Sequence, residues 1–227
     1  MVTKHDSGIL FDMDGTLFQT EKVAVPAFHR TFQRLVDRGL YKGKSPTDDQ
    51  VCSVFGMTSA DIWERLLPGA SVEVKEQADG WWLEDELDCL SEGLGALYPG
   101  VKETLIELKE RGWKLVIASN GLAPYLHGIL AKFELDRVFD GVYSAAEEKV
   151  AKKSELIRIL LQEMGIRRGF MIGDRSSDVE GGKGNELPVI GCRYTGFPTF
   201  ADEGELRGAD HVIDHFSQIK GLVGNPK

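Results

Sequence analysis

The chain has 227 residues, of which 42% are hydrophobic, so it is long enough to bury a core in one large or two smaller domains. Its formal net charge is −9 and its basic residues form no cluster, which argues against nucleic acid and anionic membranes as partners. Three widely spaced cysteines, with no apolar signal segment and no membrane-length apolar stretch, favour a reduced cytoplasmic protein over a disulfide framework or Cys-based zinc site.

The first predicted element is a buried strand in the segment GILFDMDGTLF, residues 8–18. Ile9 to Phe11 form an apolar run typical of a parallel sheet, and Asp12 and Asp14 follow directly. Ligands of open α/β sheets bind outside the carboxyl ends of the strands, and residues two apart in extended backbone point the same way. Two such carboxylates suit Mg²⁺, and Gly15 lets backbone N–H groups approach a phosphate. Taken alone, the same residues are also typical of a turn.

The next segment is helical by its apolar spacing. Phe28, Phe32 and Leu35 recur at helical intervals before Gly39, and further helices are predicted from about Thr47. Two more helices are expected over residues 61–67 and 71–90. Since no apolar strand run interrupts this part of the chain, we expect a helical cap domain of residues 19–97, inserted into a core of residues 1–18 and 98–227.

From residue 98 onward the pattern alternates between helix and strand, the signature of βαβ units. Helices are predicted from residue 101 to Gly112, over 124–133 and over 153–164, and strands over 114–118, near 142–143, and over 170–172, 189–192 and 211–213. The predicted fold class is therefore α/β: a Rossmann-like parallel sheet flanked by helices, with a small all-helical cap domain.

Polar residues follow two further predicted strands, as they do the first. Ser119 and Asn120 end the strand KLVIA, and Asp174 ends the strand FMI, with Asp178 at the start of the next helix. Individually, each has a structural explanation as a turn, a helix N-cap or an early-helix acid. In a parallel sheet all these strand ends lie at one edge, so we expect the residues to converge on the two acids of the first strand.

The segments DMDGTL, IASNG, a lysine before a helix, and MIGDRSSD resemble, in this order, the four motifs of the haloacid dehalogenase superfamily. The likeness is to its phosphoglycolate phosphatase-like group, whose helical cap is inserted after the first strand, and it covers residues 7–17 and 98 to about 216. It implies Mg²⁺-dependent hydrolysis of a small phosphorylated metabolite, phosphoglycolate-like or a sugar phosphate, through an aspartyl-phosphate intermediate. Asp14 departs from the dehalogenase and phosphonatase branches, which lack an acid at this position.

The resemblance implies a role for each motif residue. Asp12 would be the nucleophile, and Asp14 would protonate the leaving oxygen and then activate water, which agrees with the chemistry of paired carboxyl groups. The phosphoryl group would be bound by Gly15, Ser119, Asn120 and Lys153. The Mg²⁺ site would comprise Asp12, Asp14 through its carbonyl, Asp174 and Asp178, the last of these binding or orienting the metal shell.

The phosphate-binding lysine has three neighbouring candidates. We prefer Lys153, because the segment KSELI places it at the start of a helix, as in the family's variant Lys-x-x-x-Ile pattern. Lys152 is the second choice and Lys149 the third. The more common Lys-Pro form of this motif is absent from the chain.

Two other functions fit parts of the pattern. A β-phosphoglucomutase-like phosphotransferase would share the acid pair and the inserted cap, and a non-catalytic phospholigand-binding protein would share the fold. The intact acids favour an enzyme over the latter. Because the core motifs hold only the phosphoryl group and the metal, we expect a mobile cap to supply the contacts to the rest of a small-molecule substrate.

Overall fold

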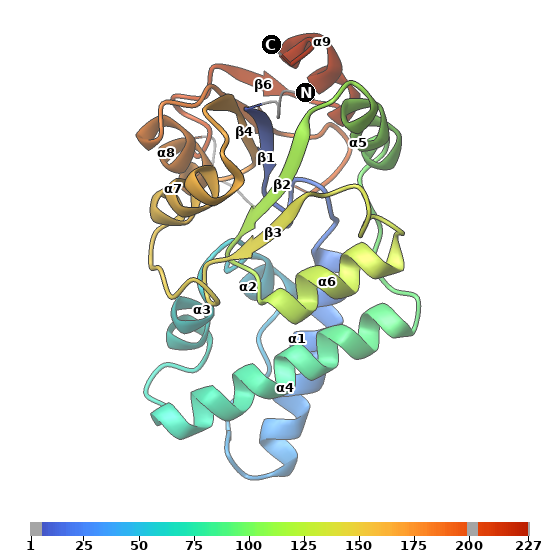
Figure 1. Ribbon diagram of the computed structural model, residues 1–227. Helices are drawn as coiled ribbons and strands as arrows, with labels where there is room; N and C mark the ends of the chain where they lie inside the picture. The colour runs from blue at the N-terminus through green and yellow to red at the C-terminus, as the bar shows by residue number, and fades with distance from the viewer. Residues whose placement is uncertain (1–5, 199–203, 227) are drawn as a thin grey trace.

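The computed structural model describes residues 6–198 and 204–226. Its centre is a six-stranded parallel sheet in the order β3-β2-β1-β4-β5-β6 (Figure 1). The strands are β1 (Ser7–Phe11), β2 (Lys114–Ser119), β3 (Gly141–Ser144), β4 (Arg168–Gly173), β5 (Val189–Cys192) and β6 (His211–Ile213). The predicted fold class is thus confirmed.

Strand β1 shows why the sheet is covered on both faces. Ile9 and Phe11 belong to one apolar cluster and Leu10 to another, since successive side chains of a strand point to opposite faces. Helices α7 (Lys153–Met164) and α8 (Ser176–Gly184) cover the face of Leu10. The opposite face is covered by α5 (Val101–Glu110), α6 (Ala123–Lys132), the short 3₁₀ helix η1 (Phe216–Gln218) and α9 (Ile219–Val223).

The segment between β1 and α5, which we call the insertion, contains α1 (Glu21–Asp37), α2 (Asp48–Cys52), α3 (Ser59–Leu66) and α4 (Val72–Ser91). It has its own apolar cluster around Phe28, Phe32 and Trp63. Helix α4 packs against both α1 and α6, so the insertion lies across the lower end of the sheet in Figure 1. None of the described helices is long and apolar enough to cross a membrane.

The two connections between the insertion and the rest of the chain run side by side. Phe18 forms an isolated antiparallel bridge with Leu97, and the Gln19 side chain donates a 2.7 Å hydrogen bond to the carbonyl of Leu97. This pairing holds both connections beside the carboxyl end of β1. The division into a core of residues 1–18 and 98–227 and a cap of residues 19–97 stays a prediction, and residues 1–5, 199–203 and 227 lie outside the described part of the chain.

Candidate functional site

Polar residues from three neighbouring strands meet at one edge of the sheet. Asp12 follows β1, Ser119 ends β2 and Asp174 follows β4. Strands β2 and β4 flank β1. After β1 the chain adds β2 and then β3 on one side of it, and then crosses to the other side to add β4. The carboxyl edge at β1 is therefore a topological switch point, where α/β sheets form their ligand crevices.

Three acids form a buried cluster at this edge. Asp12, Asp174 and Asp178 each offer a carboxylate oxygen, and these atoms lie within 4.8 Å of one another. Burial, followed by the negative charges of the other two acids, raises the pKa of Asp174 well above its usual range. Carboxylate oxygens gathered at such distances are the donor set that a hard divalent cation requires, so these residues fit Mg²⁺.

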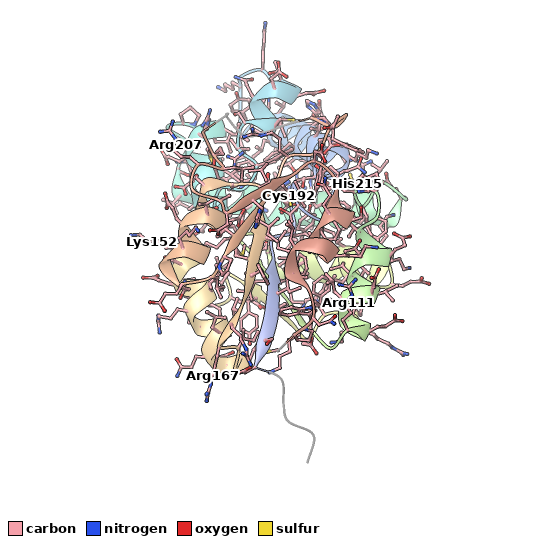
Figure 2. The ribbon with its side chains drawn as sticks, turned by 90° about the horizontal axis from the view of Figure 1, so that it is seen from above. Arg111, Lys152, Arg167, Cys192, Arg207 and His215 are labelled. Carbon is pink, nitrogen blue, oxygen red and sulfur yellow. The ribbon has the colours of Figure 1, made fainter. Side chains whose placement is uncertain are left out.

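Lys153 contacts two of these acids from the start of α7. Its Nζ lies 3.0 Å from Oδ1 of Asp12 and 2.5 Å from Oδ1 of Asp178, and the residue is 4% exposed. Burial by itself lowers the pKa of Lys153, but the two carboxylates raise it above its usual value, so the amine stays charged. Lys152 and Lys149 are exposed, and Figure 2 shows Lys152 at the surface. The structure thus brings Lys153, and neither alternative, to the acidic cluster.

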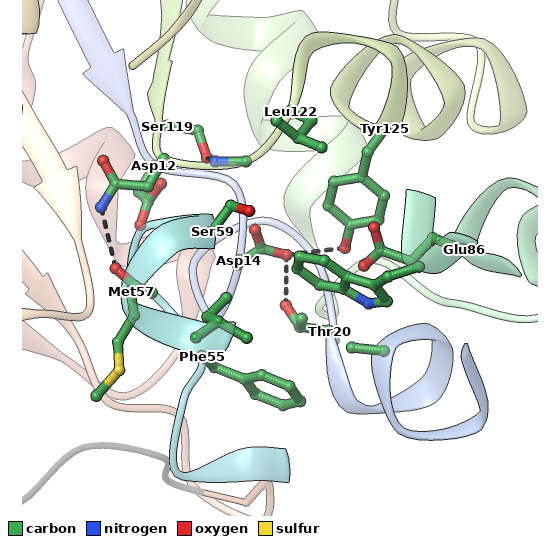
Figure 3. A pocket seen from close by; sticks show the side chains of 16 residues that line it. Asp12, Asp14, Thr20, Phe55, Met57, Ser59, Glu86, Ser119, Leu122 and Tyr125 are labelled. Atoms are coloured by element: carbon green, nitrogen blue, oxygen red, sulfur yellow. Dashed lines mark hydrogen bonds between the residues drawn. The ribbon is translucent and has the colours of Figure 1, made fainter. Parts of the chain in front are cut away.

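The side chain of Asp14 points to a different set of partners. Its Oδ1 accepts hydrogen bonds from the Thr20 hydroxyl at 2.7 Å and from the Tyr125 hydroxyl at 2.9 Å (Figure 3). Burial and then the charge of Asp12 raise the pKa of Asp14 to about 6, although both hydrogen bonds oppose this rise. A carboxyl group that titrates near neutral pH is suited both to donate and to accept a proton.

Gly15 makes room for a tight turn after β1. Its N–H donates to the carbonyl of Phe18 at 3.1 Å, and Gly15 does not line the cavity described below. Its expected part in binding the phosphoryl group stays a prediction. Its φ is +72°, and a Cβ at this position would lie 2.3 Å from Oδ2 of Asp174. Glycine is needed here because the loop after β1 turns tightly against Asp174.

Ser119 and Asn120 end β2 at the same edge. The Ser119 hydroxyl oxygen accepts a 3.1 Å hydrogen bond from the N–H of Gly121 and lines the cavity. The Asn120 amide instead donates to the carbonyl of Gly56 at 3.0 Å, in the loop between α2 and α3. Asn120 thus connects the sheet to the insertion.

The sheet edge and the insertion enclose a cavity of about 40 Å³ (Figure 3). That volume has room for only a few water molecules. The sheet side contributes Asp12, Asp14, Ser119, Asn120, Gly121, Leu122 and Tyr125, and the insertion contributes Thr20, Ala24, Phe55, Gly56, Met57, Ser59, Ile62, Trp82 and Glu86. Sequence reasoning did not identify Thr20, Tyr125 or Glu86, because none belongs to a motif and each reaches the site only through the fold.

The chain is similar to known hydrolases in both sequence and structure. The family model described as haloacid dehalogenase-like hydrolase matches residues 9–192. The pyrophosphatase PpaX of Halalkalibacterium halodurans is 29% identical, over 95% of this chain and 96% of its own. The phosphoglycolate phosphatase of Pectobacterium atrosepticum is 24% identical, over 96% and 92%. The crystal structure of a predicted phosphoglycolate phosphatase from Haemophilus somnus is similar with a TM-score of 0.80 and 21% identity, over 98% and 99% of the two chains.

Proposed function

This chain belongs to the haloacid dehalogenase-like hydrolase family and is a phosphatase of that family, and we propose that it hydrolyses a small phosphomonoester through an aspartyl-phosphate on Asp12, with Mg²⁺. One observation carries this proposal: Asp12 lies beside a charged lysine and two further buried acids, with Asp14 facing the same cavity. Relatives named for pyrophosphate and phosphoglycolate support a small phosphorylated substrate. We place the protein in the cytoplasm, which its three free cysteines support.

In the first step, a carboxylate oxygen of Asp12 attacks phosphorus and the bond to the leaving oxygen breaks, while Asp14 donates its proton to that oxygen. In the second step, a water molecule attacks the phosphorus of the aspartyl-phosphate and gives a proton to Asp14. Inorganic phosphate leaves, and the carboxylate of Asp12 is restored. The pKa of about 6 at Asp14 supports both halves of this cycle, because the group must give and take one proton in turn.

The remaining residues stabilise charge. Asp12, Asp174 and Asp178 would hold Mg²⁺, as would the Asp14 carbonyl by analogy with the family. When bound, Mg²⁺ neutralises phosphoryl oxygens and so lets an anionic carboxylate approach phosphorus. Lys153 orients Asp12 through its 3.0 Å contact and adds a fixed positive charge at the phosphoryl position. Ser119 would donate its hydroxyl to a phosphoryl oxygen.

The insertion serves as a cap that opens for substrate entry. The cavity of about 40 Å³ is too small for a metabolite, and the hydrogen bond from Asn120 to Gly56 fastens the cap to the sheet edge. Closure over the bound substrate would exclude bulk water from the reacting phosphoryl group. In this proposal the cap comprises residues 19–97, and the catalytic core comprises residues 1–18 and 98–227.

Two assays test the proposed phosphatase function: hydrolysis of an aryl phosphate and isomerisation of a hexose phosphate. The purified protein should release phosphate from an aryl phosphate with Mg²⁺, lose that activity in excess EDTA, and leave a hexose phosphate unisomerised. Asp12→Asn should abolish turnover in a folded protein. Isomerisation would favour the β-phosphoglucomutase-like alternative, and phosphate-ester binding without turnover in any metal would favour the non-catalytic alternative.

A further inference from the structure

One acid in the cavity differs from the others in having no partner. Glu86 lies on α4, is 3% exposed and lines the cavity, where Figure 3 shows it next to Tyr125. Among residues 6–198 and 204–226 the structure gives its carboxyl group no hydrogen bond and no ion pair. The charges that act on it are those of Asp14 and Asp79, both negative, and with burial they raise the pKa of Glu86 well above its usual range.

Two other acids of the same helix, Asp79 and Asp85, have partners. Asp85 accepts from the Thr31 hydroxyl at 2.7 Å and from Arg34 at 3.1 Å, and Asp79 accepts from the indole N–H of Trp63 at 2.8 Å. A buried carboxyl group without a partner is costly, and such a group in a ligand cavity points to a partner that arrives with the ligand. Glu86 is therefore set apart from acids that stabilise the fold.

The described part of the chain also places no positive charge in the cavity wall that could pair with a second anion. No lysine, arginine or histidine is among the described residues that line it. Lys153 is not one of the lining residues, and its Nζ pairs with Asp12 and Asp178. The Arg175 side chain, close to Gly56, has its Nε 3.9 Å from a carboxylate oxygen of Glu205. A carboxylate or second phosphate on the leaving group would thus meet Glu86 without a compensating cation.

We infer that Glu86 determines specificity: the leaving group of the substrate carries an O–H or N–H donor that bonds to Glu86, and carries no second anionic group. This inference rests on the phosphatase function proposed above. Phe55, Met57, Ile62 and Leu122 form apolar walls for the carbon skeleton of such a leaving group. Once the cap has opened to admit a substrate, hydroxylated and amino-alcohol phosphates match Glu86 in charge and hydrogen bonding, whereas phosphoglycolate and pyrophosphate do not.

Three two-carbon phosphate esters that differ in one end group test the inference. They are 2-hydroxyethyl phosphate, phosphoethanolamine and phosphoglycolate, each assayed with Mg²⁺ for kcat/KM alongside an aryl phosphate. The hydroxyl and ammonium esters should exceed the carboxylate ester by at least about tenfold, since like charges in a dry site repel strongly. A value for the ammonium ester above that for the hydroxyl ester marks an ionised Glu86 and supports the inference. The reverse order marks a protonated Glu86, which can donate a hydrogen bond to a carboxylate, and would overturn the exclusion of a second anionic group.

The variant Glu86→Gln keeps the shape and removes the negative charge, so the discrimination against phosphoglycolate should fall several-fold. Asp88→Asn, an exposed acid on the same helix, should leave that ratio unchanged. Equal or better turnover of phosphoglycolate by the natural chain, or an unchanged ratio in a folded Glu86→Gln protein, would overturn the inference while the phosphatase function stands. Failure to hydrolyse any ester, the aryl phosphate included, would overturn the phosphatase function itself.

Discussion

The hydroxyl of Tyr125 donates a 2.9 Å hydrogen bond to Oδ1 of Asp14, and so connects α6 to the loop after β1. Burial and the nearby Asp14 charge raise the pKa of Tyr125 well above its usual value, so the hydroxyl keeps its proton and remains a donor. This bond favours the ionised form of Asp14 and opposes the burial that favours the protonated form. Tyr125 is thus placed to adjust the pH at which the proposed general acid and base changes state.

Tyr125→Phe should shift the pH dependence of aspartyl-phosphate hydrolysis upward by on the order of one pH unit. The variant loses one of the two hydrogen bonds that lower the pKa of Asp14, so Asp14 releases its proton only at higher pH. Transient kinetics with an aryl phosphate, whose leaving group needs no proton, measure this step. Tyr143→Phe is the control, since that hydroxyl donates at 3.0 Å to Glu163 on the surface. If the pH midpoint of this step were the same in Tyr125→Phe and Tyr143→Phe, the hydroxyl of Tyr125 would not influence the pKa of Asp14.

Lys153→Met should lower kcat by about a hundredfold or more, because a fixed charge in a partly dry site stabilises the transferring phosphoryl group. Lys152→Met and Lys149→Met should have a kcat close to that of the natural chain, because both lysines are exposed. Steady-state rates of the three variants, with circular dichroism as a check of folding, give the ranking. If Lys152→Met were the inactive variant, the proposed role of Lys153 would be wrong.

Asp174→Asn should have opposite effects on stability and on metal binding. Without metal its Tm should be higher than that of the natural chain, because the variant removes a buried negative charge beside Asp12 and Asp178. With metal, the Mg²⁺ concentration for half activity should rise at least about tenfold. Thermal melts with EDTA or Mg²⁺ measure both, and Asp136→Asn, an exposed acid, is the control. If Mg²⁺ raised the Tm of Asp174→Asn as much as it raises that of the natural chain, Asp174 would not be a metal ligand.

Glu86→Gln should stabilise the protein increasingly as the pH rises. The pKa of Glu86 is raised in the folded state above the ordinary 4.5, so the unfolded chain releases this proton at lower pH and the natural chain loses stability as pH rises above that value. Glutamine has no such loss. In thermal melts with EDTA, Glu86→Gln and the natural chain should have the same Tm near pH 4. At pH 8 the variant should melt several degrees higher, which corresponds to a difference of about 1–3 kcal/mol in the free energy of unfolding. A difference that does not change with pH would contradict this account of Glu86.

The strands and the helices that flank the sheet were largely predictable from the sequence, because most of them carry an apolar run with a glycine or proline near one end. Helix α7 and strands β5 and β6 have the bounds that the pattern predicted, residues 153–164, 189–192 and 211–213. Lys153 is the first residue of α7, as the segment KSELI and its resemblance to the family's Lys-x-x-x-Ile pattern had suggested, and its part in catalysis stays a proposal. Convergence of the strand ends required only that the sheet be parallel.

Contacts between side chains that are far apart in the chain could not be predicted from the sequence. The bond between Tyr125 and Asp14 joins residues 111 positions apart, and nothing local to Tyr125 marks it. Glu86 stands among other acids on α4, so no apolar stripe identifies which acid points inward. The ring of Trp82 stacks on that of Phe28, with 4.7 Å between their centroids, and the same residue also lines the cavity. Contacts of this kind depend on how the insertion rests on the sheet.

Direct identification of the phosphorylated residue tests the central claim, that Asp12 is the nucleophile. The protein is quenched during turnover of an aryl phosphate with Mg²⁺, treated with borohydride, which reduces an acyl phosphate to an alcohol, and mapped by peptide mass spectrometry. Homoserine is expected at position 12, absent without substrate and absent in Asp12→Asn. A burst of leaving group with homoserine at another position, or with no reduced residue, would contradict it.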